Sequence, residues 1–314
     1  NNESLTFCGR KNEQCMTIKK AMITAASNAR TILSDSSSLV INYVKSQQNS
    51  DGGFKGRSDR SDLYYTMFGI DCLTALGSTP NFPLQNYIKS LESPGSLDFV
   101  HLCSYIQLIS SLSKNDLNIE GFDNPERQEI FRKKIEDYRS ADGGYNITKH
   151  SRTGSVYGCF LAVSAYEELN LPISNVDGIL ECLNKLKTKD GGFSNEVGLQ
   201  HGITTATSAA LILLKKYNQQ IPVQSIDWLL DMFHITCGFL AFPGAPLPDL
   251  LSTATALHCL GEVECDIDIL RENCLDYINT LWSEEGAFYG NWADDKTDVE
   301  YTFYGLLSIG NLCR

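Results

Sequence analysis

The chain has 314 residues, of which 42% are hydrophobic, and a mean hydropathy of -0.18, so it is long enough to bury a substantial core. Its formal net charge of -12 argues against a nucleic-acid surface or an anionic membrane surface as partner, because both require a basic patch. No apolar run approaches the roughly 20 residues of a membrane-spanning helix, and the N-terminus shows no signal-peptide pattern. Eleven cysteines, scattered as single residues, indicate reduced thiols and a cytoplasmic location.

The first part of the chain differs from the rest. Residues 1–35 contain one predicted helix, from about Met16 to Leu33, and no repeat of the kind that follows. We therefore expect an N-terminal helical extension over residues 1–35, outside the repeats, and a single domain over residues 36–314.

From Ser37 onward, amphipathic runs alternate with more apolar runs, and Gly-rich turns separate many of them. Residues 114–124 form an inserted loop, and Pro94-Gly95 replaces one of the Gly-Gly turns. The predicted helix pairs are 37–48 with 62–76, 83–91 with 98–112, 125–139 with 155–169, 176–186 with 202–214, 223–233 with 250–260, and 267–281 with 299–312.

Two features of these pairs predict a closed ring. Equivalent positions recur every 36 to 56 residues, which is typical of a helical repeat array. The second helix of each pair is nearly apolar all round and must be buried, whereas the first has a charged face. An inner ring of helices inside an outer ring satisfies both patterns, and an open solenoid would leave two exposed ends. We expect an all-α fold, an (α/α)6 toroid.

The turns carry a resemblance to a known superfamily. Asp51-Gly52-Gly53-Phe54, Asp142-Gly143-Gly144-Tyr145 and Asp190-Gly191-Gly192-Phe193 resemble the Gly-Gly-aromatic repeats of the protein prenyltransferase β-subunits and the squalene/terpene cyclases. The resemblance covers about residues 36–314. It implies a toroid whose central funnel holds an isoprenoid chain, and, for the prenyltransferase branch, a helical partner subunit.

The prenyltransferase chemistry is only partly retained. The resemblance places the family's zinc ligands, Asp, Cys and His, at Asp249, Leu251 and Tyr301, so we expect no zinc. The family's basic diphosphate grip falls on residues 242–246, which contain no basic side chain. A His-Gly that contacts diphosphate in the family matches His201 and the glycine after it.

The cyclase chemistry is also incomplete. The Asp-x-Asp-Asp-Thr-Ala acid motif of the cyclases best matches residues 249–254, where only the first Asp remains. The resemblance still favours a zinc-independent protein that transfers or cyclises a prenyl diphosphate, with His201 at the phosphate and Asp249 or Tyr301 as acid or base. The alternative is a non-catalytic scaffold that binds an isoprenoid or a peptide.

Asp294, Asp295 and Asp298 spell a DDxxD pattern, which resembles the Mg²⁺-diphosphate motif of prenyl and terpene synthases. Here the pattern precedes its helix, so a solvated acidic loop ending in a helix cap is the competing interpretation. Mg²⁺ is the only cofactor that the sequence suggests. His234 with Cys237, and Cys8 with Cys15, are too few ligands for a zinc site.

One rim of the ring is the candidate binding region. Asp residues begin several inner helices and either cap them or gather around the funnel with His201. Aromatic and histidine side chains one turn deeper are expected to line the cavity, and Arg57 lies in a Gly-rich turn that suits an anion. The predicted ligand-binding residues are His201, Tyr65, His101, Tyr105, Arg57, Asp62 and Asp298.

Overall fold

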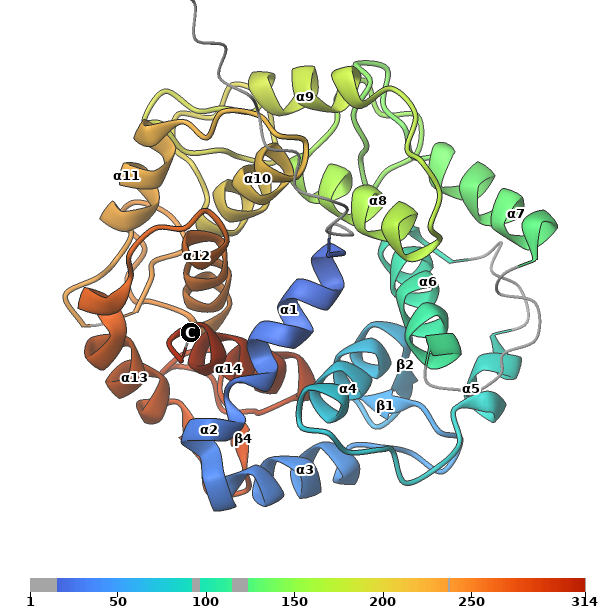
Figure 1. Cartoon of the computed structure of the whole chain (residues 1–314), viewed down its shortest axis with the longest axis vertical. Helices are drawn as coiled ribbons and strands as arrows, with labels where there is room; N and C mark the ends of the chain where they lie inside the picture. The colour runs from blue at the N-terminus through green and yellow to red at the C-terminus, as the bar shows by residue number, and fades with distance from the viewer. Residues whose placement is uncertain (1–15, 92–96, 115–123, 237, 314) are drawn as a thin grey trace, which may run out of the picture.

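A computed structural model describes residues 16–91, 97–114, 124–236 and 238–313. Figure 1 shows two concentric rings of helices, viewed along the axis of the rings. The Pro94-Gly95 turn, residues 115–123 of the inserted loop, the Cys8 and Cys15 pair and Cys237 lie outside the described residues.

Within the described ranges, the inner ring consists of α4 (Leu63–Ala75), α6 (Phe99–Lys114), α8 (Val156–Glu168), α10 (Thr204–Lys216), α12 (Leu250–Glu262) and α14 (Val299–Asn311). The outer ring consists of α3 (Ser37–Ser46), α5 (Gln85–Ser90), α7 (Pro125–Glu136), α9 (Val176–Lys185), α11 (Val223–Asp231) and α13 (Arg271–Thr280). Each inner helix contacts the next, and α14 contacts α4, so the ring is closed. The predicted all-α toroid and its helix pairs are confirmed.

Burial explains which helix of each pair is inside. Ten of the thirteen residues of α4 are buried, and Asp71 is its only charged residue. On α7, only Phe131 and Ile135 are buried, and charged residues cover the outer side. The outer helices therefore pack one apolar stripe against the inner ring, whereas the inner helices are surrounded by protein on nearly all sides.

In five of the six repeats, a described Gly-aromatic turn follows the outer helix and packs against the inner helix. The aromatic side chains are at most 1% exposed, and they are Phe54, Tyr145, Phe193, Phe239 and Phe288. Three of these residues donate their backbone N–H to a threonine on the inner helix, Phe54 to Thr66 at 2.9 Å, Phe193 to Thr207 at 2.9 Å and Phe239 to Thr253 at 3.0 Å. The short strands β1 (Phe54–Lys55), β2 (Ser61–Asp62), β3 (Trp282–Ser283) and β4 (Ala287–Phe288) form two-stranded ribbons at such turns.

The N-terminal helix lies in the middle of the ring. The predicted helix of residues 16–33 is two helices, α1 (Ile18–Ser27) and α2 (Arg30–Leu33), and a short 3-10 helix at Ser34–Ser36 follows them. Another 3-10 helix, Asp268–Leu270, precedes α13. Figure 1 shows α1 inside the inner ring, and α1 contacts α14, α4 and α8. Although α1 adds no repeat, as expected, it is part of the core rather than an appendage on the outside.

Ionic and polar contacts hold α1 in place at the C-terminal ends of the inner helices. Lys19 Nζ lies 2.9 Å from Asp71 Oδ1 of α4, and both side chains are 6% exposed. Burial raises the pKa of Asp71, and the nearby Lys19 ammonium opposes that rise. At the start of α1, the backbone N–H of Ile18 donates to Glu167 Oε2 of α8 at 2.8 Å. Thus α1 closes this end of the ring.

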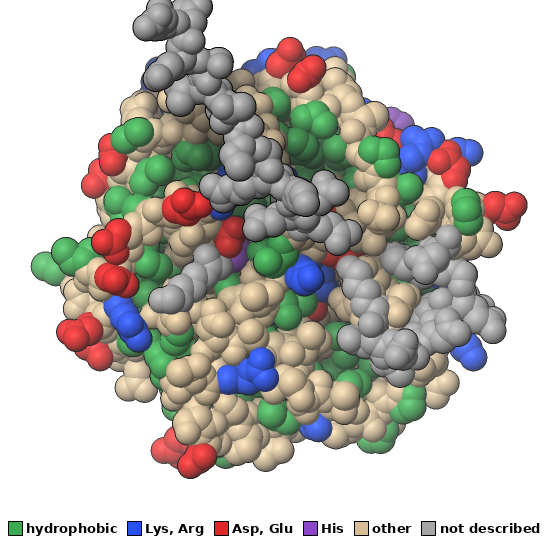
Figure 2. Space-filling model, viewed as in Figure 1, with side chains coloured by type: hydrophobic (Ala, Val, Ile, Leu, Met, Phe, Trp, Pro, Cys, Tyr) green, Lys and Arg blue, Asp and Glu red, His purple; other side chains and the backbone are tan. Residues whose placement is uncertain are grey.

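Figure 2 shows the same face of the molecule with its side chains. Among the atoms that are not grey, acidic and basic side chains are interspersed with hydrophobic ones rather than gathered by sign. In the part of the chain that the structure describes, no helix is both long enough and apolar enough to cross a membrane.

Candidate functional site at the centre of the ring

The aspartates that begin inner helices act as N-caps. Asp62 accepts hydrogen bonds from the backbone N–H groups of Tyr64 at 2.9 Å and Tyr65 at 3.2 Å. Asp249 accepts one from Ser252 at 2.8 Å, and Asp298 one from Tyr301 at 2.9 Å. These bonds satisfy N–H groups that have no partner inside the helix.

Contacts between neighbouring repeats place these helix starts at one rim. The backbone N–H of Thr204 on α10 donates to Ala241 O in the loop before α12, and that of Leu250 on α12 donates to Gly290 O in the loop before α14, both at 2.8 Å. The same pattern continues around the ring, because Arg57 in the loop before α4 bonds to Asp298 of α14. The inner helices therefore begin at the rim opposite α1.

Arg57 forms the contact between the first and last repeats. Its Nη1 and Nη2 donate to the two carboxylate oxygens of Asp294 at 3.0 and 2.5 Å, and its Nε donates to Asp298 at 2.9 Å. Its guanidinium also lies 5.5 Å from the centre of the Tyr301 ring. Arg57 is thus a structural cation that two aspartates neutralise.

The same contacts bear on the magnesium prediction. Burial raises the pKa of Asp294, but the hydrogen bonds and charge of Arg57, together with hydrogen bonds from the backbone of Lys296 and Gly290, outweigh it, so the net pKa is lowered. Over the described ranges, no three His, Cys, Asp or Glu side chains lie close enough to hold a metal ion. The geometry therefore gives no support to Mg²⁺ at Asp294, Asp295 and Asp298, which stays a prediction.

His101 joins two rim aspartates. Its Nδ1 lies 2.8 Å from Asp98 Oδ2, and its Nε2 lies 3.4 Å from Asp62 Oδ2. Hydrogen bonding to Asp62, followed by that to Asp98, raises the pKa of His101 to about 9. His101 is therefore charged at neutral pH and links α4 to α6.

The other predicted site residues are spread apart. The His201 side chain is 68% exposed, with Nδ1 3.3 Å from Asp190 Oδ2. It does not line the central cavity, which is described next. Tyr105 faces outward, where its hydroxyl accepts a hydrogen bond from Arg127 of α7 at 3.1 Å. Asp249 is held by Ser252, and burial raises its pKa.

A cavity of about 250 Å³ lies inside the inner ring. Met22 of α1 lines it at one end, and the side chains of α14 that line it are Glu300, Tyr304 and Leu307. The other described lining residues are Tyr64, Tyr157, Phe160, Asn195, Thr205, Ala206, Ser208, Ala209, Ile212, Leu251, Thr255 and His258. The cavity is thus mainly aromatic and aliphatic, and α1 limits its length.

Two of the predicted aromatic lining residues contact loops at the rim instead of the cavity. Tyr65 packs against Gly56 and Tyr301 against Gly290, both in rim loops. Neither is among the described residues that line the cavity, whereas Tyr64 and Tyr304 are. Successive helical residues differ by about 100° in direction, so Tyr64 faces the cavity while Tyr65, the next residue, faces the rim loop.

Glu300 is the residue that sequence reasoning missed. Tyr64 Oη donates a hydrogen bond to Glu300 Oε1 at 2.7 Å. Burial raises the pKa of Glu300 to about 7, against the opposing effect of the Tyr64 hydrogen bond. A signal was present, because Glu300 is the only charged residue of an otherwise uncharged buried helix, VEYTFYGLLSIGN. A protonated carboxyl group in an apolar cavity can donate a proton.

Comparison with known proteins agrees with the fold. The chain matches the family model of the prenyltransferase alpha-alpha toroid domain over residues 17–224 and 203–313, and it belongs to this family. No curated protein matches it.

Among solved structures, the chain is similar to the type II terpene cyclase MstE from Scytonema in its apo form, at 13% identity, with 90% of this chain and 97% of that chain covered and a TM-score of 0.59. A variant of that cyclase in complex with geranylgeranyl dihydroxybenzoate, its substrate, aligns with 12% identity, 91% and 97% coverage and a TM-score of 0.59. Candida albicans protein geranylgeranyltransferase-I complexed with GGPP aligns with 13% identity, 93% and 90% coverage and a TM-score of 0.54. At these identities the likeness shows the fold alone.

Proposed function

We propose that the chain binds a short isoprenoid in the central cavity and starts its cyclisation by protonating a double bond with Glu300. The observation that carries this proposal is the placement of Glu300, a carboxyl group with a pKa of about 7, among aromatic and aliphatic side chains. A general acid works best when its pKa lies near the working pH, and burial provides that shift here.

The proposed step conserves atoms and charge. The carboxyl O–H of Glu300 gives its proton to a terminal alkene carbon, and the alkene's π electrons form the new C–H bond. The resulting carbocation is attacked by the next double bond, which closes a ring and moves the positive charge to the ring. The cyclic carbocation then loses a proton to form a neutral alkene, and the uptake of a proton by the Glu300 carboxylate restores the acid. The aromatic rings of Tyr64, Tyr157 and Tyr304 line the cavity and stabilise a cation through their π faces.

The charge of the lining favours a neutral substrate. Of the described residues that line the cavity, none is Lys or Arg, and His201 lies outside it. A diphosphate needs such cations. The predicted diphosphate contact at His201 therefore stays a prediction with little support. A volume of about 250 Å³ lies below the ~300–1,000 Å³ typical of ligand pockets, so we favour a ten- or fifteen-carbon chain.

Glu300→Gln tests this proposal. The parent protein is incubated with neutral geranyl and farnesyl compounds, and cyclic products are sought by mass spectrometry. The change to Gln keeps the hydrogen bond to Tyr64 but removes the acidic proton, so turnover should fall at least about 100-fold while binding persists. Glu272→Gln, on the exposed side of α13, is the matched control.

Farnesyl diphosphate with and without Mg²⁺ is the comparison substrate. Cyclisation of the neutral compounds by the Glu300→Gln variant at the parent rate would overturn the role of Glu300. Turnover of the diphosphate, but not of the neutral compounds, would favour the transfer or cyclisation of a prenyl diphosphate that the sequence predicted.

The second candidate is a non-catalytic isoprenoid-binding protein. The specific observation in its favour is that α1 occupies part of the ring's interior and leaves a small cavity. Calorimetric binding of the neutral compounds without product formation, in the parent and in Glu300→Gln alike, would support it. A helical partner subunit also stays a prediction, to be tested by capture of a stable heterodimer.

A further inference from the structure

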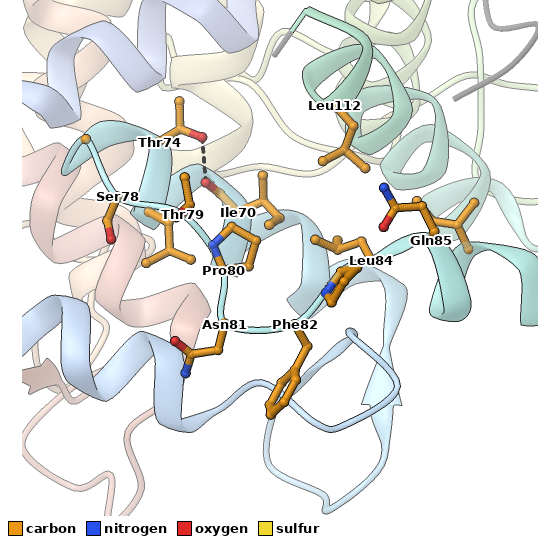
Figure 3. A pocket seen from close by; sticks show the side chains of 14 residues that line it. Ile70, Thr74, Ser78, Thr79, Pro80, Asn81, Phe82, Leu84, Gln85 and Leu112 are labelled. Atoms are coloured by element: carbon orange, nitrogen blue, oxygen red, sulfur yellow. Dashed lines mark hydrogen bonds between the residues drawn. The ribbon is translucent and has the colours of Figure 1, made fainter. Parts of the chain in front are cut away.

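A larger cavity, of about 730 Å³, lies outside the inner ring between the first two repeats. It is lined by the C-terminal half of α4, the loop of residues 77–84, the start of α5 and Leu112 of α6. Figure 3 shows these side chains around the space. None of its described lining residues lines the central cavity, so the two are separate.

The loop that forms one wall is fixed by a buried side chain. Gln48, 7% exposed, accepts hydrogen bonds from the backbone N–H groups of Asn81 at 2.8 Å and Phe82 at 3.0 Å. The same side chain donates to Phe82 O at 2.9 Å. Gly77, at φ 69, ends α4, and the N–H of Ser78 donates to Leu73 O at 2.8 Å. These contacts form the wall without a ligand.

The floor of this outer cavity is apolar. Ile70, Leu73, Leu84 and Leu112 are each at most 4% exposed, and their side chains line the space. None of the described lining residues is Asp, Glu, Lys, Arg or His. A charged ligand would therefore lose its hydration without gaining an ionic partner. A neutral apolar chain has little hydration to lose and would make van der Waals contacts with the floor.

One buried polar atom beside this cavity has no hydrogen-bond donor. Gln85 Oε1 is buried and accepts no hydrogen bond. In Figure 3 the Gln85 side chain points into the space between Leu84 and Leu112. A buried acceptor without a donor is destabilising, and most buried polar groups in proteins are paired. A ligand hydroxyl group placed here would pair with it.

We propose that this outer cavity is a second binding site, which takes a neutral amphiphile with an apolar chain and a hydroxyl group, and that Gln85 Oε1 accepts the hydrogen bond of that hydroxyl. The chain lies on the floor of Ile70, Leu73 and Leu84. The site does not depend on the proposed function of the central cavity.

The experiment uses two ten-carbon alcohols, geraniol and 1-decanol, and their methyl ethers, which keep the chain but lack the donor. Calorimetry measures binding to the parent protein and to Ala209→Trp, which fills the central cavity. We expect each alcohol to bind Ala209→Trp, and to bind at least about 5-fold more tightly than its ether. A preference for geraniol over 1-decanol would show that the site selects an isoprenoid alcohol. Equal binding of the two would show that it accepts fatty alcohols in general.

Two variants locate the site. Gln85→Leu removes the acceptor at similar size, so alcohol and ether should bind it equally. Thr74→Trp, at an exposed position on the cavity wall, should abolish this binding while Ala209→Trp does not. Thermal unfolding of each variant shows whether it folds.

Both cavities are open in the parent protein, so equal affinity of alcohol and ether at every site that calorimetry resolves there would overturn the proposal, and that measurement needs no variant. Loss of all binding in a folded Ala209→Trp would do the same, since it would place the ligand in the central cavity. Failure of cyclisation, by contrast, would leave this second site untouched.

Discussion

Glu300 shows how the environment of one residue sets its chemistry. Its folded-state pKa of about 7 is above the ordinary 4.5, so folding favours the protonated form. Its contribution to stability is present below about pH 4.5 and is lost as the pH rises through 7. A shift of this size corresponds to about 3 kcal/mol at most.

Glu300→Gln should remove this dependence. We expect the variant to match the parent near pH 4.5 and to exceed it by up to about 3 kcal/mol in free energy of unfolding near pH 8, because Gln has no charge to bury. Urea unfolding across this pH range measures the difference, with Glu272→Gln as control. A constant difference between variant and parent at all pH values would contradict the assigned pKa.

The positions that match the family's zinc ligands allow a second test. Asp249 remains, while Leu251 and Tyr301 stand where the family has Cys and His. Leu251→Cys with Tyr301→His would complete three ligands, so we expect Co²⁺ to bind with a thiolate charge-transfer band. Each single variant should bind far more weakly.

The parent protein is the reference in this test. A cobalt spectrum of equal strength in the parent, or none in the double variant, would show that these positions do not correspond to the family site. The new ligands would lack side chains placed to orient them, so we expect an affinity about 10–100-fold below that of a site with such support.

At the scale of helices, the sequence predicted where helices occur along the chain much better than which helices contact one another in space. Hydrophobic periodicity identified both helices of every repeat, because burial on one side or all sides leaves a direct trace in the sequence. The cap positions Asp62, Asp249 and Asp298 followed from the same pattern. The place of α1 could not be predicted, since an amphipathic helix does not encode which surface will cover it.

The buried ion pair between α1 and α4 makes an element-scale prediction. Lys19→Met leaves Asp71 without its partner in the core, and we expect a loss of about 3–5 kcal/mol in stability. The double variant Lys19→Met with Asp71→Leu should recover most of that loss, because no buried charge is left. Urea unfolding of the parent and the variants measures it. A single variant as stable as the parent would mean that α1 is not held as described.

For the whole molecule, ring closure depends on the contact between the first and last repeats. Arg57→Met removes the partner of Asp298, which is fully buried, and of Asp294. We expect a loss of about 1–3 kcal/mol in stability, partly offset by the cap bond from Tyr301. Arg60→Met, in the same loop and exposed, is the matched control. Equal stability of both variants would assign closure to the apolar contacts alone.

The position of α1 also constrains the order in which the chain can fold. Asn28, just after α1, donates a hydrogen bond to Gly310 O of α14 at 3.5 Å, across 282 residues of sequence. When a ribosome releases α1, helix α14 has not yet been made, so the apolar side of α1 stays uncovered until the chain as far as Gly310 has been translated. Contacts this distant in sequence slow folding and leave intermediates open to aggregation. Although α1 is translated before the other described helices, it is therefore among the last of them to reach its native position.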